Sequence, residues 1–224
     1  MNTKLKTTFW QLAVSLIPLI YLAIIWENLS EQVPMHYNSS GVDRYGSKWE
    51  LFCVTVFVSV ISFGSALLLR YLNRIDPKRK NHEPSSTMLK LSWVLLIFIS
   101  TLSLFIIYSS LNYSLSGTVT FSGKYLMLFI CLMFVVLANF LNSIKPSYFV
   151  GFRTPWALAN EENWRKTHFL GSRVMFFTGI IMGVLILLVP EKISHYIFVA
   201  GAILTVVVPF VYSYNLFRKE RGES

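Results

Sequence analysis

Long apolar runs separated by short polar stretches make up most of the chain. A helix needs roughly 20 apolar residues to cross the hydrocarbon core of a bilayer. The runs that are long enough lie at residues 7–26, 51–71, 88–108, 125–141, 170–189 and 196–217. The pattern therefore predicts an all-α polytopic membrane protein, a bundle of six transmembrane helices.

Composition agrees with a bilayer as the solvent. The chain is 54% hydrophobic and 14% charged, too few charges to cover the surface of a soluble domain of this length. The first apolar run ends in YLAIIWENL without a small-residue cleavage site, so we expect it to stay as an anchor. Cys53 and Cys131 lie inside apolar runs and are expected to be small buried hydrophobes.

The positive charge is distributed as in a membrane protein. The net charge is +9, but the basic residues flank apolar runs instead of forming one face of a polar domain, which argues against nucleic-acid binding. Sixteen Lys and Arg lie at the two termini and in the second and fourth connections, against four in the other three connections. This asymmetry predicts that both termini face the cytoplasm.

The same pattern suggests a division of the chain. We expect a two-span unit with an extracytoplasmic loop at 1–75, a cytosolic linker at 76–87 and a four-span domain at 88–224. Pro77 and Pro84 interrupt helix in the linker. Gly179 and Gly183 form a GxxxG spacing that favours packing within the bundle, with homodimerisation as the alternative.

The first polar loop, ENLSEQVPMHYNSSGVDRYGSKWE, separates the first two apolar runs. VPMHYN favours an extended strand and NSSG a turn, while Tyr45 and Trp49 suit the aromatic belt at a membrane interface. His36, Asp43 and Glu50 raise the question of a metal site, but their spacing matches no metal-ligand pattern. We expect an ion pair or a solvated loop instead.

A second polar stretch, YFVGFRTPWALANEENWRKTHF, occupies residues 148–169. Thr154 is a suitable N-cap and Pro155 a suitable first helical residue, which predicts a cytosolic interfacial helix at about 155–171.

One face of this helix would carry Trp156 and Trp164 as anchors, together with Asn160, Asn163 and Thr167. The opposite face would carry the ion pairs Glu161–Arg165 and Glu162–Lys166. Arg153 precedes the cap and is able to contact lipid phosphate, a helix C-terminus or a partner carboxylate. A plain interfacial anchor is the alternative interpretation of the whole stretch.

At these residues the chain resembles the SdpI family of bacterial membrane proteins, in NFLNSIKPSYFVGFRTPWALANEENW. The family pattern is matched by Asn139, Pro146, Gly151, Arg153, Thr154, Pro155, Trp156, Leu158 and Trp164. Ala157 stands in place of the usual Thr, and Ser147 where many members have Asn. The first loop is similar to the extracytoplasmic N-terminal segment of longer members, at Pro34, His36, Asn38, Gly41, Asp43, Tyr45 and Gly46.

The resemblance implies a multi-pass protein of the bacterial plasma membrane with an immunity or receptor-type role. The family's founding member protects its cell against a secreted peptide toxin and sequesters a cytosolic repressor at the membrane. That member lacks a recognisable His-aromatic-Asn loop. The implied partners are the lipid bilayer, an antimicrobial peptide outside and a cytosolic repressor inside. The Gly-x-Arg-Thr-Pro-Trp residues would respond to toxin or partner, and no cofactor is expected.

Other functional classes fit the sequence less well. A small transporter or permease is the main alternative, but the interiors of the six apolar runs contain no Asp or Glu for ion coupling. An enzyme would need a convergent nucleophile, base or metal set. His36 and Asp43 are expected outside and Glu161 and His168 inside, so they form no such set, and we predict that the protein is not an enzyme.

Overall fold

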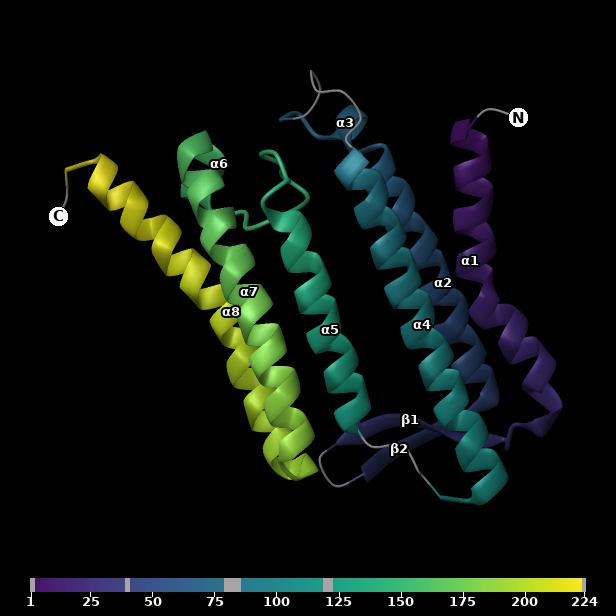
Figure 1. Ribbon diagram of the computed structural model, residues 1–224. Helices are drawn as coiled ribbons and strands as arrows, with labels where there is room; N and C mark the ends of the chain where they lie inside the picture. Colours follow the sequence, from purple (N-terminus) through teal and green to yellow (C-terminus); the bar gives the residue numbers. More distant parts are fainter. Residues whose placement is uncertain (1–2, 39–40, 79–85, 119–122, 223–224) are drawn as a thin grey trace. The chain divides into compact units, whose positions relative to one another are not determined.

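The computed structural model describes residues 3–38, 41–78, 86–118 and 123–222. Within these residues it contains six helices that are long and apolar enough to cross a membrane, as expected (Figure 1). They are α1 (Thr3–Ile25), α2 (Lys48–Arg70), α4 (Ser86–Ser116), α5 (Gly123–Leu141), α7 (Glu161–Leu188) and α8 (Glu191–Glu220). The apolar runs of the sequence therefore predicted every one of these helices.

The chain forms two compact units. The first unit consists of Met1–Tyr71 and Met88–Ser122, and the second of Leu72–Thr87 and Gly123–Ser224. The sequence-based division instead placed the whole of 88–224 in one domain. The difference concerns α4, which packs with the N-terminal helices.

Buried polar side chains join the helices of the first unit. Gln11 of α1 donates a hydrogen bond to the Ser92 hydroxyl of α4 at 2.9 Å. Ser62 of α2 donates to the carbonyl oxygen of Leu96 on α4 at 3.3 Å. Serine is small, so it lets helix backbones approach closely, and its hydroxyl finds a partner away from water. These contacts explain why α4 belongs to this unit.

A two-stranded antiparallel hairpin lies between α1 and α2, following the 3₁₀ helix η1 (Trp26–Asn28). Its strands are β1 (Gln32–Asn38) and β2 (Gly41–Ser47), so the extended VPMHYN segment is confirmed. Ser39 and Ser40 of the expected turn lie outside the described residues. The hairpin is held to α4, because the Tyr37 hydroxyl and the Ser109 hydroxyl share a hydrogen bond of 2.8 Å.

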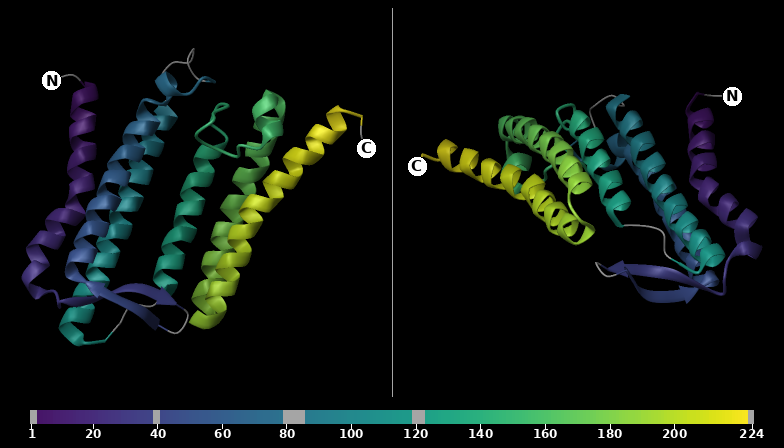
Figure 2. Two further views of the ribbon diagram at one scale, coloured as in Figure 1. Left: turned by 180° about the vertical axis from the view of Figure 1, so that it is seen from behind. Right: turned by 60° about the horizontal axis from the view of Figure 1, so that its bottom comes forward.

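The second unit contains α5, α7 and α8 with two short helices, α3 (Leu72–Ile75) and α6 (Pro155–Ala159) (Figure 2). The GxxxG spacing brings α7 close to α5. A Cβ added at Gly179 would lie 3.1 Å from the Cys131 carbonyl oxygen, a tight contact that a larger residue could make only if α5 moved by a few tenths of an ångström. Packing within the chain, the favoured interpretation of this motif, is the one observed.

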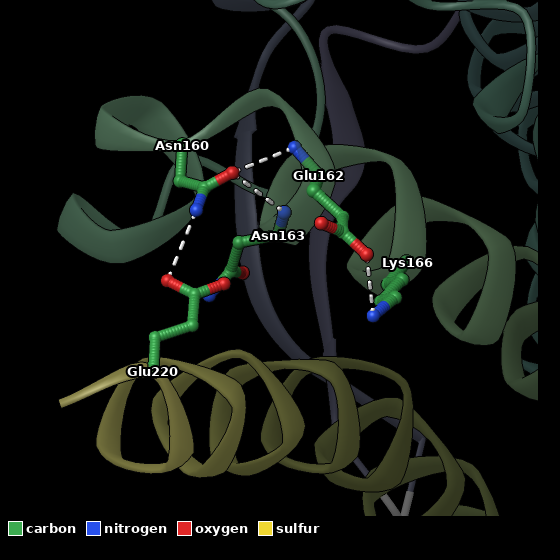
Figure 3. A network of polar contacts seen from close by, with 5 residues as sticks. All are labelled: Asn160, Glu162, Asn163, Lys166 and Glu220. Carbon is green, nitrogen blue, oxygen red and sulfur yellow. Dashed lines mark hydrogen bonds and ion pairs between the residues drawn. The ribbon is translucent and has the colours of Figure 1, made fainter. Parts of the chain in front are cut away.

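The helix expected at 155–171 begins as predicted but ends early. The Thr154 hydroxyl caps α6 by accepting from the N–H of Ala157 at 3.1 Å, and Pro155 is its first residue. Asn160 then adopts an extended backbone, with φ −132° and ψ 122°. Its side-chain oxygen accepts from the N–H groups of Glu162 at 2.7 Å and Asn163 at 3.3 Å (Figure 3).

This second cap explains the correction, because Asn at an N-cap begins a new helix and ends the old one. Residues 161–171 are therefore the first turns of α7, which runs on without a break to Leu188. A short helix does lie between α5 and α7, but it stops at Ala159.

Candidate functional site

Most of the candidate motif residues lie in the connector, which we define as residues 142–160 between α5 and α7. The connector has little regular structure outside α6, so its shape depends on side-chain hydrogen bonds. The Ser147 hydroxyl accepts from the N–H groups of Phe149 at 3.1 Å and Val150 at 3.3 Å. Ser147 itself is fully buried and forms a tight local turn at the start of the motif.

Asp76 holds this turn in place. Its carboxylate accepts from the Ser147 hydroxyl at 2.6 Å, from the Tyr148 N–H at 3.0 Å and from the Lys78 N–H at 2.9 Å. Asp76 is fully buried. Asp76 is the first residue of the segment expected to be a cytosolic linker, and it is part of a packed contact instead. Hydrogen-bond donors to both carboxylate oxygens compensate for the lost water.

Lys78 makes a second attachment between the same segment and the connector. Its ammonium group donates to the carbonyl oxygen of Leu158 at 2.5 Å and lies 5.9 Å from the centre of the Tyr148 ring. The beginning of the expected linker is thus bound to the motif. Residues 79–85 of that linker, including Pro84, lie outside the described residues.

Gly151 packs directly against α7. Its φ is +105°, a backbone angle that residues with a side chain rarely adopt. A Cβ at this position would also collide with the His168 ring. The next residue, Phe152, donates its backbone N–H to Nε2 of His168 at 3.0 Å. His168 Nδ1 lies 2.9 Å from the carbonyl oxygen of Trp164, which only accepts. The imidazole is therefore neutral, with its proton on Nδ1.

Trp164 is part of this buried cluster. Its ring stacks on His168 with centroids 4.0 Å apart, and its indole N–H donates to the Ile144 carbonyl oxygen at 2.8 Å. Only 2% of Trp164 is exposed, so the expectation of a headgroup anchor is wrong for this residue. A fully hydrogen-bonded indole inside the protein secures the connector to α7.

Trp156 faces α8 instead. It is half-buried and contacts the rings of Phe210, Tyr214 and Phe217, at centroid distances of 5.3, 4.9 and 6.0 Å. Trp156 and Trp164 were predicted to lie on one face of a single helix. They have different surroundings because the break at Asn160 places them in separate helices, α6 and α7.

A buried polar network joins the connector, α7 and α8. The Thr154 and Ser213 hydroxyls lie 2.6 Å apart, and Ser213 donates to the Asn163 side-chain oxygen at 2.7 Å. The Thr167 hydroxyl donates to the same oxygen at 3.0 Å, and the Asn163 amide donates to the Ser213 carbonyl oxygen at 2.9 Å. Since Ser213 donates its only hydroxyl proton to Asn163, it accepts from Thr154, which is the donor of that pair. Every member of the network is thus satisfied.

Arg153 is the exposed member of the motif. One of its N–H groups donates to the Tyr148 carbonyl oxygen at 2.9 Å. Within the described ranges it pairs with no carboxylate. It borders a cavity of about 460 Å³, whose other lining residues are Tyr148, Gly151, Phe152, Thr154, Pro155, Val206 and Phe210.

The exposed start of α7 carries one of the two expected ion pairs. Glu162 and Lys166 are 2.7 Å apart, as predicted. Glu161 and Arg165 are both described, and no ion pair forms between them. The Asn160 amide also donates to Glu220 of α8 at 3.0 Å, which ties the end of α6 to the end of α8 (Figure 3).

Asn139 remains apart from the other motif residues. It is exposed on α5, and its amide donates to the Val135 carbonyl oxygen of the same helix at 2.8 Å. The structure therefore gathers Gly151, Thr154 and Trp164 around α7 and leaves Asn139 outside that cluster.

The candidate residues of the hairpin are paired with one another at its surface. His36 and Asp43 are 2.6 Å apart, and Arg44 forms an ion pair with Glu50. The ion-pair interpretation of these residues is thus the one observed. No group of three or more potential metal ligands gathers in the part of the chain that the structure describes.

The remaining hairpin candidates have structural surroundings. Pro34 is buried, and a Cβ at Gly46 would collide with Met35 and the Glu50 carboxylate. Tyr45 is exposed, with its ring 5.4 Å from that of Tyr113. Asn38 and Gly41 are partners at the end of the ladder.

Sequence reasoning missed Asp76, His168 and Ser213. His168 could have been found, because it follows Trp164 by four residues and so lies on the same helical face. Asp76 and Ser213 carry no such signal. Their partners are 71 and 59 residues away in the chain, at Ser147 and Thr154 respectively.

The chain is similar to known proteins over most of its length. Residues 143–213 match the profile of the SdpI/YfhL protein family, and residues 13–59 match a domain of unknown function, DUF1648. The chain is 23% identical over 199 residues to Immunity protein SdpI of Bacillus subtilis (strain 168). The aligned region covers 89% of this chain and 90% of that protein. No solved structure matches the chain.

These matches agree with the geometry. The segment that matches the family profile contains most of the connector, α7 and most of α8, the elements that the buried network joins. The six membrane-length helices add the architecture of a multi-pass protein of the bacterial cell membrane. The resemblance to the SdpI family is thereby confirmed.

Proposed function

We propose that the protein gives its cell immunity to a secreted antimicrobial peptide, as a receptor-type protein of the plasma membrane. The observation that carries this proposal is the similarity to Immunity protein SdpI across 89% of the chain. The cluster around Gly151, Thr154 and Trp164 supports it, because the motif residues form one defined structure.

The connector is proposed to report the state of the helices. Thr154 is bonded to α8 through Ser213, and Phe152 is bonded to α7 through His168. A shift of α7 against α8 would therefore strain both attachments and move the exposed Arg153. A cytosolic repressor that recognises Arg153 would then bind in one state and dissociate in the other.

This role requires that the connector face the cytoplasm and the hairpin the outside. The excess of Lys and Arg at the termini and in the second and fourth connections supports that orientation. To test it, Gln32→Cys in β1 and Ala159→Cys in α6 are made separately, with Cys53 and Cys131 replaced by Ala. Both positions are exposed. An impermeant thiol reagent should label position 32 in intact cells and position 159 only after lysis. The reverse pattern contradicts the orientation.

Deletion of the gene tests immunity itself. Cells without the gene should be killed by a peptide fraction from spent medium of the producing organism, and the wild-type gene should restore survival. Labelled peptide should stay at the surface of protected cells. Steady outward flux of labelled peptide would support a transporter instead, and unchanged survival of the deletion strain would contradict immunity.

Arg153 offers the sharpest test of the connector. Arg153→Lys should reach the membrane in normal amounts yet lose most of the protection, because Lys cannot reproduce the bidentate contacts of a guanidinium. Glu161→Gln, at the exposed start of α7, is the matched control and should protect like the wild type. Full protection by Arg153→Lys at equal abundance would reduce the connector to a lipid anchor.

A further inference from the structure

We propose that the groove beside Arg153 binds one anionic phospholipid, with the phosphate at the guanidinium and an acyl chain along α8. This inference does not depend on the proposed immunity role. It follows from the charge of Arg153, from the apolar side chains of α8 that line the groove, and from the position of the connector along α8.

The charge comes from Arg153 and is not neutralised nearby. The guanidinium carries five N–H donors, and the hydrogen bond to the Tyr148 carbonyl uses one of them. A carboxylate partner for Arg153 is missing from the described part of the chain. Beside Tyr148, another lining residue, the positive charge of Lys78 and the negative charge of the buried Asp76 offset each other, so Arg153 sets the sign of the charge. The entrance of the groove is therefore positive and favours an anionic group.

The apolar part continues from this entrance along α8. The cavity beside Arg153 is lined on the α8 side by Val206 and Phe210. A second cavity, of about 440 Å³, is lined by Phe198, Val199, Ala202, Ile203, Val206 and Val207. Val206 lines both cavities, so the two are neighbours along α8, and together they make up the proposed groove. From Phe198 to Phe210 it extends about 18 Å at 1.5 Å per residue. That is close to one leaflet of a hydrocarbon core about 30 Å thick.

The depth of the connector explains why an amphiphile fits better than a free anion. Thr154 bonds to Ser213, which precedes Glu220 at the charged end of α8 by seven residues, or about 10 Å. Arg153 precedes Thr154 in the chain. It therefore lies nearer the middle of α8 than the charges at the end of that helix, beside the apolar surface of α8. A cation at such a depth gains from a phosphate at the headgroup boundary, while the groove below it accepts a hydrocarbon chain.

Native mass spectrometry of the full-length protein in detergent tests the proposal. Phosphatidylglycerol and phosphatidylcholine with the same acyl chains are titrated separately. The wild type should bind one phosphatidylglycerol at least about fivefold more tightly than phosphatidylcholine, as expected for a charge contact near a membrane surface. No preference between the two lipids overturns the proposal.

Two substitutions, each with a matched control, test the headgroup contact and the acyl-chain contact separately. Arg153→Gln should reduce the preference for phosphatidylglycerol to less than about twofold, since the cation is lost. Arg165→Gln removes a cation from the exposed start of α7 and is the control, with the preference retained. Val206→Trp should fill the groove and weaken binding of both lipids, whereas Val211→Trp, exposed on α8 outside both cavities, should not.

If Arg153→Gln and Arg165→Gln reduce the preference for phosphatidylglycerol equally, that preference comes from the general surface charge, and the proposed site is overturned. Normal lipid binding by Val206→Trp would overturn the acyl-chain assignment. Arg153→Lys should keep most of the lipid preference because the charge remains, even if it loses protection. The lipid site and the immunity role can thus fail independently, because lipid binding is measured without any toxin.

Discussion

The hairpin β1–β2 and the connector are both polar insertions between apolar helices, but they satisfy their polar groups in different ways. The hairpin pairs its charges at the surface, where the His36 and Asp43 side chains remain 66% and 37% exposed. The connector instead forms buried hydrogen bonds with neighbouring segments: Ser147 of the connector and its surroundings Asp76 and Asn163 are at most 1% exposed.

The difference has an energetic consequence. Exposed ion pairs contribute little, because water and salt compete for both partners. A buried polar group left without its partner loses the interaction and keeps the cost of desolvation. The connector should therefore be sensitive to single substitutions that the hairpin tolerates, even though both regions carry candidate functional residues.

The largest effect is expected at Gly151. Gly151→Ala places a methyl group against His168 and forces a side chain into a positive φ, so it should destabilise the protein by about 4 kcal/mol. Thermal unfolding of the purified protein measures this. Gly183→Ala is the control, because its added Cβ would lie 3.7 Å from Cys131 in ordinary contact. Similar unfolding temperatures for the two variants would contradict the packing of Gly151.

Asp76 and Glu50 compare a buried carboxylate with an exposed one. Asp76→Ala leaves the Ser147 hydroxyl and the Tyr148 N–H without their acceptor, and should destabilise by about 3 kcal/mol. Glu50→Ala breaks only an exposed pair with Arg44 and should change stability by no more than about 1 kcal/mol. Denaturation in detergent ranks the two variants, and equal losses would remove the distinction between the two regions.

The two tryptophans test whether the buried cluster depends on a specific hydrogen bond. Trp164→Phe removes the indole N–H that Ile144 accepts from and should destabilise by about 2 kcal/mol. Trp156→Phe keeps an aromatic ring against α8 and should lose less than about 1 kcal/mol. The same unfolding measurement applies. A larger loss at Trp156 would mean that the contacts to α8 dominate.

The smallest effect is expected at the exposed start of α7. Glu162→Gln breaks the pair with Lys166, in which both side chains are substantially exposed, so the unfolding temperature should not change measurably. This position should behave like the hairpin although it adjoins the connector. A clear loss of stability that disappears at high salt would show that surface charges matter more here than expected.

Local signals in the sequence were sufficient for several features of the candidate site. Thr154 and Pro155 begin a helix because their chemistry is suited to its first turn. The GxxxG spacing marked the face of α7 that approaches α5. Helical spacing also placed Asn163, Trp164 and Thr167 on one face, which the structure shows to be a common buried surface.

The sequence by itself determined the six membrane-length helices, because a bilayer requires long apolar runs whatever the helices pack against. Only the tertiary structure decided what covers each face. Lipid-facing and protein-facing surfaces are both apolar, so their pattern does not distinguish α4 packing with α1 and α2 from packing elsewhere. The burial of Asp76 was likewise invisible, because the donors that make it tolerable come mainly from Ser147 and Tyr148, more than 70 residues away.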